Sequence, residues 1–133
     1  VSSGPIGSVS DKNLKKSFED NFFSHQICAS EAVKIMLSQK SRGCLLFNIS
    51  KQSVNPGLNF GSYGLPKTAL LGLCKQYALD YGKFGIRSNG VNADRIKSGI
   101  LNSSMIALAS IFSLFMHHLG ATEQRSITQC PSD

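Results

Sequence analysis

Residues 44–49 read Cys-Leu-Leu-Phe-Asn-Ile, a short and mostly apolar run that ends at Ser50. A run of this length between turn residues indicates a β-strand, and its nearly continuous apolar character predicts a strand that is buried on both faces. Such strands are typical of parallel sheets, in which neighbouring strands are joined by crossover helices. The stretch therefore predicts an α/β fold, and the segments on either side should contain the crossover helices.

The segment before this strand has the pattern of a long amphipathic helix. Ser10 is suited to cap its N-terminus, and Ser41 to Gly43 would end it just before the strand. Apolar positions recur at steps of three and four residues and form one stripe. The stripe comprises Leu14, Phe18, Phe22, His25, Ala29, Ala32, Val33 and Met36.

The segment after the strand predicts a loop, a second helix and a second strand. Asn, Pro and Gly residues punctuate Ser53 to Ser62, and roughly Tyr63 to Tyr81 has a helical apolar face. Pro66 is expected in the first turn of that helix, where a missing N–H costs little. Ile86 to Val91 is bounded by turn residues and predicts another parallel strand. This order of elements is that of an α/β parallel sheet.

Composition is that of a globular protein and narrows the classes of function. The 133 residues are 41% hydrophobic and 17% charged, and the formal net charge of +6 is scattered along the chain, so no nucleic-acid partner is indicated. The four cysteines form no C-x-x-C pair and have no histidine at metal-ligand spacing, which predicts reduced thiols, a cytoplasmic location and no metal site. Met105 to Leu119, the most apolar stretch, is shorter than the roughly 20 residues that a bilayer requires, so no membrane contact is expected.

Three residues around the predicted loop could carry chemistry: Ser50, Tyr63 and Lys67. Tyr63 and Lys67 are four residues apart at the start of a predicted helix, so their side chains share one face. A free phenol ionises near pH 10, and a lysine charge about 4 Å away favours the phenolate by about 4 kcal/mol at an effective dielectric near 20. Ser50 ends the strand at the carboxyl edge, where open α/β sheets bind ligands. Each residue alone also has an ordinary interpretation, as a chance pair or a turn-forming serine.

The order and spacing of Ser50, Tyr63 and Lys67 resemble the Ser and Tyr-x-x-x-Lys signature of the short-chain dehydrogenase/reductase family. Residues 77–82 and 85–92 are similar to the end of a helix and to the Gly-Ile-Arg-x-Asn-x-Val strand of that family, and the likeness covers about residues 8–107. The resemblance implies the C-terminal part of a Rossmann-like, doubly wound parallel sheet from which the N-terminal nucleotide-binding βαβ units are missing. It also implies one domain over residues 1–107 and a divergent tail over residues 108–133, for which a frameshifted or chimaeric segment and a substrate lid both remain open.

The resemblance implies an oxidoreductase that uses NAD or NADP and transfers a hydride to or from an alcohol or carbonyl substrate. Tyr63 would be the acid or base, Lys67 would lower its pKa and bind the nicotinamide ribose, and Ser50 would position the substrate. Asn21 falls where the family keeps a catalytic asparagine that anchors a water in the proton relay, although a polar residue on a helix face is the alternative. The residues expected to contact the cofactor are Tyr63, Lys67, Ala93, Asp94, Ile96 and Ser98.

Finer features of the resemblance concern the subfamily and the assembly. Residues 47–52 and 92–96 are most similar to the dehydrogenase half of bifunctional aldolase/dehydrogenase proteins that act on sugar-derived alcohols. The family's Pro-Gly after the last strand is replaced by Ala93-Asp94, which puts the nicotinamide-side loop in doubt. The two long helices imply a homodimer or a homotetramer. Two functions stay open: part of an NAD(P)-dependent oxidoreductase, or a non-catalytic remnant that acts only as an oligomerising or binding module.

Overall fold

The computed structural model describes residues 3–93, in which two strands alternate with helices. The strands β1 and β2 form a parallel ladder, with Gly43 opposite Ile86 and Asn48 opposite Val91. This pairing confirms the predicted α/β fold with its helical crossover. The elements, in chain order, are η1 (Ile6–Ser8), α1 (Asp11–Phe18), η2 (Glu19–Phe23), α2 (Ser24–Ser38), β1 (Gly43–Asn48), η3 (Lys51–Ser53), α3 (Gly61–Tyr81), η4 (Gly82–Phe84) and β2 (Ile86–Val91).

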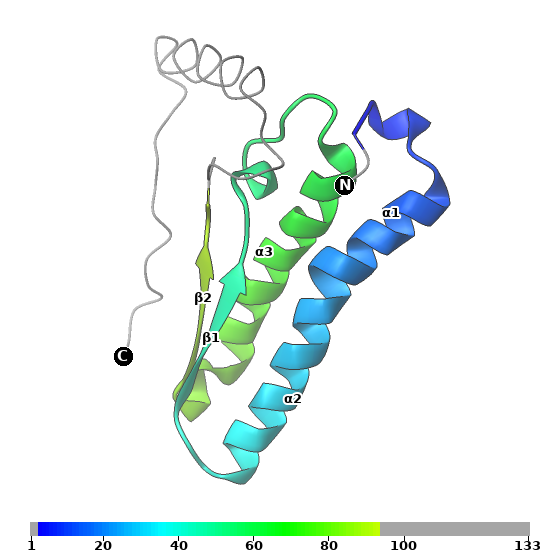
Figure 1. Cartoon of the computed structure of the whole chain (residues 1–133). Coiled ribbons are helices and arrows are strands. Elements are labelled where there is room, and N and C mark those ends of the chain that lie inside the picture. The colour runs from blue at the N-terminus through cyan, green and yellow to red at the C-terminus, as the bar shows by residue number, and fades with distance from the viewer. Residues whose placement is uncertain (1–2, 94–133) are drawn as a thin grey trace, which may run out of the picture. The chain divides into compact units, whose positions relative to one another are not determined.

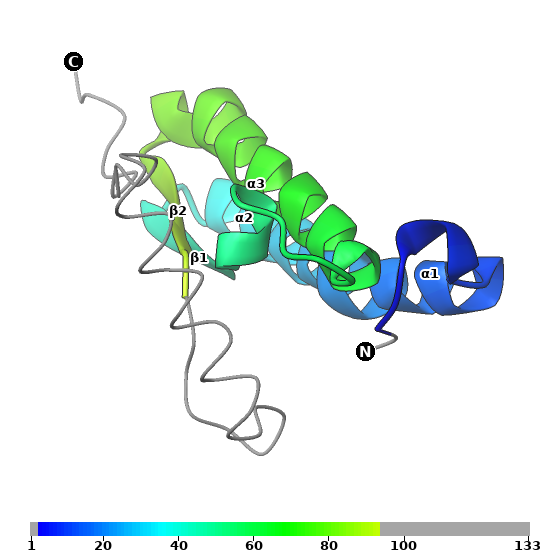
Figure 2. The same cartoon turned by 90° about the horizontal axis from the view of Figure 1, so that it is seen from above.

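The helices α2 and α3 lie on the same side of the two strands (Figures 1 and 2). Side chains in β1 consequently alternate: Leu45 and Phe47 are buried, whereas Cys44 and Leu46 are exposed, Leu46 by 69%. The prediction of a strand buried on both faces is therefore wrong for this part of the chain. Successive side chains of a strand point to opposite faces, and within residues 3–93 helices cover only one of those faces.

The long helix before β1 is confirmed, but one turn of π-helix interrupts it. Ser10 caps α1 as predicted, since its side chain accepts a hydrogen bond from the Asn13 N–H at 3.3 Å. Between α1 and α2, the backbone N–H of Ser24 donates to the Glu19 carbonyl, which is the five-residue spacing of a π turn. Such turns are frequent near functional sites.

Pro66 occupies a different place in its helix from the one predicted. The helix α3 begins at Gly61, and the amides of Tyr63 and Gly64 both donate to the Phe60 carbonyl. Pro66 is consequently the sixth residue of α3 and lies beyond the first turn. Its ring is fully buried, so packing offsets the backbone hydrogen bond that proline cannot make.

The core lies between the covered face of the strands and the two long helices. Leu70 of α3 and Ile86 of β2 are almost completely buried, and the rings of Phe47 and Tyr77 are 6.0 Å apart. The Tyr77 hydroxyl donates to Oε1 of Gln26 at 3.1 Å, which joins α3 to α2. A phenol buried in this way usually requires such a partner, so the core fixes the relative position of the helices.

A glycine allows the end of β1 to pack closely against β2. A Cβ atom added at Gly90 would lie 2.0 Å from Cδ1 of Ile49, which is far inside van der Waals contact. The Ile49 side chain, only 4% exposed, thus occupies the volume that a residue larger than glycine would need.

The packing of α3 gives a direct stability test. We expect Leu70→Ala to lower the free energy of unfolding by about 2–5 kcal/mol, because the fully buried leucine would leave a cavity. The matched control is Lys75→Ala on the same helix, which is exposed and should change stability by no more than about 0.5 kcal/mol. Urea denaturation followed by circular dichroism measures both, and equal effects of the two variants would contradict the assigned core.

Candidate active site

Lys67 is a buried charge at the carboxyl end of β1. It projects from α3, its side chain is only 3% exposed, and its Nζ donates to the carbonyl oxygen of Asn48 at 2.8 Å. Burial lowers the pKa of Lys67, because the ammonium loses hydration. The hydrogen bond to the strand replaces part of that hydration and fixes the position of Nζ.

Tyr63 lies beside Lys67, one helical turn earlier on α3. The Lys67 Nζ is 5.6 Å from the centre of the Tyr63 ring, and the tyrosine is partly exposed. The two side chains therefore share one helix face, as their four-residue spacing predicted. This arrangement places a cation against an aromatic ring whose hydroxyl can exchange protons.

Ser50 is buried where the chain leaves β1. Its side-chain oxygen accepts from the Gln52 N–H at 3.3 Å, and its carbonyl accepts from the hydroxyl of Ser53. The hydroxyl of Thr68 in turn donates to the Ser53 carbonyl at 3.3 Å, which ties the first part of α3 to this loop. The same helix that positions Lys67 thus also anchors the turn that holds Ser50.

The loop between Ser50 and Tyr63 is closed by a side-chain hydrogen bond. The N–H of Gly57 donates to Oε1 of Gln52 at 2.6 Å. A Cβ atom at Gly64 would lie 3.4 Å from the Gln52 carbonyl oxygen, so α3 also approaches this loop closely. These contacts give the loop a defined path over the edge of the sheet.

Of the other predicted site residues, the structure brings Ala93 to this edge. The carbonyl of Ala93 accepts from the Lys51 N–H at 3.1 Å, so Ala93 lies next to Ser50. The Asn21 side chain instead donates to the Ser17 carbonyl at 3.1 Å, and no hydrogen bond joins it to Lys67 within the described part of the chain. The remaining predicted positions lie outside the described residues: Asp94, Ile96, Ser98 and the tail 108–133.

His25 belongs to the surroundings of this site, although the sequence pattern placed it only in an apolar stripe. Its ring stacks on that of Phe47, with centroids 6.5 Å apart and an interplanar angle of 24°. Burial lowers the pKa of His25, and the positive charge of Lys67 lowers it further. The one signal in the sequence was its position four residues after Asn21, which puts it on the same helix face.

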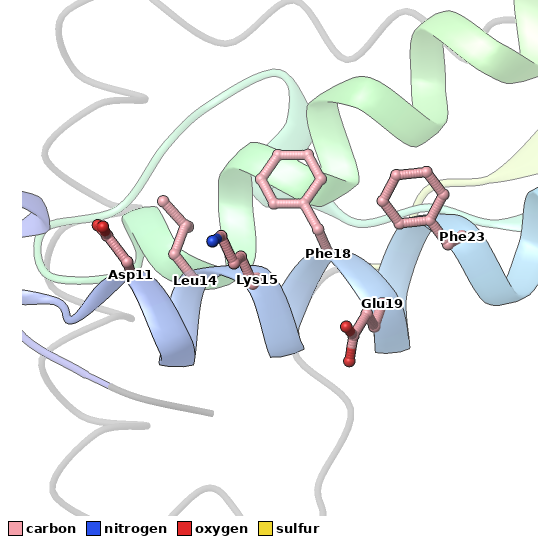
Figure 3. Close-up of a pocket in the computed structure, with 6 residues that line it drawn as sticks. All are labelled: Asp11, Leu14, Lys15, Phe18, Glu19 and Phe23. Carbon is pink, nitrogen blue, oxygen red and sulfur yellow. The ribbon is translucent and has the colours of Figure 1, made fainter.

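A pocket of about 350 Å³ lies along α1 and η2 (Figure 3). Phe18 and Phe23 give it an apolar wall, and none of its lining residues is one of the predicted site residues. The residues that line it are Asp11, Leu14, Lys15, Phe18, Glu19 and Phe23.

Two other kinds of site do not occur among residues 3–93. No group of three or more His, Cys, Asp or Glu side chains is arranged there to hold a metal ion. No helix of this described part combines the length and the apolar character that crossing a membrane requires.

The chain is similar to known oxidoreductases over most of its length. Residues 2–118 match a family model described as enoyl-(acyl carrier protein) reductase. The chain is 34% identical over 87 residues to short chain aldehyde dehydrogenase 1 of Euphorbia lathyris, a match that covers 65% of this chain and 30% of that protein. It is 27% identical over 101 residues to 2,5-dichloro-2,5-cyclohexadiene-1,4-diol dehydrogenase of Sphingobium indicum, which covers 76% of this chain and 40% of that protein. The chain thus spans less than half the length of these relatives.

The fold is also that of solved dehydrogenases. A structure of 4-hydroxyisoleucine dehydrogenase complexed with NADH matches with a TM-score of 0.73 and 26% identity, over 90% of this chain and 57% of that one. This agreement identifies the two parallel strands and their helices as part of a Rossmann-type fold. The arrangement of Ser50, Tyr63 and Lys67 agrees with the matches to the family model and to the relatives. This chain therefore belongs to the short-chain dehydrogenase/reductase family.

Proposed function

We propose that this chain provides the catalytic part of an NAD- or NADP-dependent oxidoreductase that acts on an alcohol or carbonyl substrate. The observation that carries the proposal is the buried Lys67 ammonium beside Tyr63 at the carboxyl end of β1. A structural neighbour was solved with NADH, which supports the choice of a nicotinamide cofactor. A sugar-derived alcohol is the proposed substrate, from the likeness of residues 47–52 to the dehydrogenase half of aldolase/dehydrogenase proteins.

The residues of this edge fit a nicotinamide ribose. A lysine ammonium has three N–H donors, and the Asn48 carbonyl accepts one of them. Lys67 therefore retains donors for ribose hydroxyl groups while remaining fixed to the strand. Ala93 is proposed for the nicotinamide side because it lies next to Ser50. Asp94, Ile96 and Ser98, which follow Ala93 in the sequence, are proposed for the same side from the family resemblance.

Tyr63 is proposed as the proton acceptor in alcohol oxidation and the donor in carbonyl reduction. In this proposal, Lys67 would favour the phenolate of Tyr63, and the phenolate would accept the hydroxyl proton of the substrate during oxidation. A nicotinamide held by Lys67 would supply the hydride chemistry. The hydroxyl of Ser50 would hold the substrate oxygen, and Asn21 would anchor a water that links Lys67 to solvent.

A homodimer or homotetramer is proposed, and the surfaces of the long helices support it. The cytoplasmic location stays a prediction from the sequence. Large apolar side chains are exposed on both helices: Ile27 by 64% and Ile35 by 55% on α2, and Leu79 by 70% on α3. Burying such side chains between two copies would remove apolar area from water, at about 25 cal/mol per Å². The helices are thus the proposed contact surface between subunits.

Cofactor binding by the full 133-residue chain tests the proposed function. We expect saturable NADH or NADPH binding that Lys67→Ala weakens at least tenfold, or about 1.4 kcal/mol, through loss of the ammonium donors. Tyr63→Phe should bind cofactor within about threefold of wild type, at a cost below about 1 kcal/mol, but support no turnover. Nicotinamide fluorescence measures the affinity, and Lys75→Ala, an exposed lysine on the same helix, is the control. No binding by wild type at millimolar cofactor would contradict the proposal and favour a non-catalytic binding module.

The loop that holds Ser50 offers a second test. Gln52→Ala removes the acceptor of the Gly57 N–H, so that amide should exchange with solvent about fivefold faster, the equivalent of a hydrogen bond worth about 1 kcal/mol. Gln76→Ala breaks a side-chain hydrogen bond to Asp80 on the exposed surface of α3 and serves as the control. Hydrogen exchange followed by NMR compares them. An unchanged Gly57 rate would show that Gln52 does not order the loop.

The proposed contact between subunits predicts a change in mass. Ile27→Asp should lower the molar mass measured by light scattering, because a carboxylate would have to lose hydration in an apolar contact. Gln39→Asp adds the same charge at the exposed end of α2 and should leave the mass unchanged. A wild-type chain that is strictly monomeric would contradict this surface.

A further inference from the structure

His25 is a titratable residue that the proposed mechanism does not use, yet it lies at the catalytic end of β1. Its imidazole stacks on Phe47, and its Nδ1 is 3.3 Å from the hydroxyl of Ser24. The next residue in the strand, Asn48, contributes the carbonyl that holds the Lys67 ammonium. The His25 imidazole and the Lys67 ammonium thus contact adjacent residues of β1, Phe47 and Asn48.

The groups around His25 favour its neutral form. Lys67 on α3 is the charged group that acts on it. Tyr77 of α3 also packs on Phe47, and burial raises the pKa of its phenol, so it carries no charge near neutral pH. The strand β1 contributes the uncharged ring of Phe47. Within the described residues, no carboxylate forms an ion pair with His25 that would stabilise an imidazolium.

We propose that His25 is a positioning residue for Lys67. The neutral imidazole, held on the Phe47 ring, leaves the Lys67 ammonium in place on the Asn48 carbonyl beside Tyr63. An imidazolium at the same position would repel the ammonium and weaken that placement. Only the catalytic consequence of this inference rests on the proposed function, since the NMR titration of the two side chains needs no cofactor.

The lowered pKa of His25 determines how folding stability changes with pH. Because the pKa of His25 is lowered in the folded chain, the unfolded chain takes up its proton first as the pH falls below about 6.5. Folding stability is therefore fully retained above that pH and declines below it, down to the pKa of the folded state. The effect is reciprocal: if protonation of His25 disfavours the position of the Lys67 ammonium, the ammonium in that position disfavours protonation of His25 to the same extent.

The first experiment measures the titration of His25 in the full chain by NMR of its ring carbons. We expect a midpoint below that of a free histidine, and a higher midpoint in Lys67→Met, where the repelling charge is removed. The control Lys75→Met removes an exposed lysine from the same helix and should leave the midpoint unchanged. The same midpoint in Lys67→Met as in wild type would overturn the inference.

If Lys67→Met fails to fold, a measurement on the wild-type chain still tests the inference. The side-chain resonances of Lys67 should shift with the midpoint of His25, and this shift should be absent in His25→Phe, which keeps an aromatic ring on Phe47. Lys67 resonances that do not respond to the titration of His25 would also overturn the inference.

Cofactor affinity then separates positioning from a structural role. In wild type, NADH affinity should fall roughly fivefold as the pH is lowered through the His25 midpoint, the lower end of usual coupling between two binding events. In His25→Phe the affinity should be constant over that range, whereas a merely structural histidine would give a variant that is weaker by the same factor at every pH. An unchanged pH dependence in His25→Phe would contradict positioning. A wild type that binds no NADH at any pH would refute the proposed function, and the NMR titration would still decide the role of His25.

Discussion

The hydrogen bond from the Lys67 ammonium to the Asn48 carbonyl is the contact on which the arrangement of the site depends. A buried ammonium without a partner would cost several kcal/mol, so the start of α3 has to remain against the end of β1. This requirement also fixes Tyr63, one turn earlier on the helix. Thr68, one residue after Lys67, extends the attachment to the Ser50 loop through the Ser53 carbonyl. One buried charge thereby aligns a helix, a strand and a loop.

The hydrophobic core works in the same direction and lies on the same face of α3 as Lys67. Leu70 and Tyr77 pack against the covered face of the strands, and the hydroxyl of Tyr77 reaches Gln26 on α2. Because the core holds α3 rigidly along its length, small movements at Lys67 are resisted by the packing of Leu70 and Tyr77, about one and three turns away. The polar site is thus supported by an apolar layer that takes no part in the chemistry.

The sequence was sufficient to predict most of this arrangement. Apolar periodicity gave both long helices and both strands, and the four-residue spacing of Tyr63 and Lys67 placed them on one face. Other features depend on tertiary contacts that periodicity does not contain. The apolar run 44–49 gave no sign that only one face would be covered, and the start of α3 at Gly61 shifted Pro66 out of the first turn.

The apolar periodicity of the sequence also could not predict the π turn or the neighbours of His25. Residues 19–23 contain neither Gly nor Pro to mark an irregular turn, and an apolar stripe counts His25 as one more core position without naming its neighbours. The partners of Asn21 also could not be read from sequence, since its side chain bonds the Ser17 carbonyl inside its own helix. Predictions for Asp94, Ile96 and Ser98 stay predictions.

The close approach of Gly90 to Ile49 limits how this sequence can diverge. Any residue larger than glycine at position 90 would require the side chain of Ile49 to move or to be replaced by a smaller one, so the two positions share one volume. Because the atoms in the way belong to the Ile49 side chain, a larger residue at position 90 can be accommodated without moving the backbone of Ser50. Across homologous chains, a larger residue at position 90 should therefore be accompanied by a smaller or differently oriented side chain at position 49.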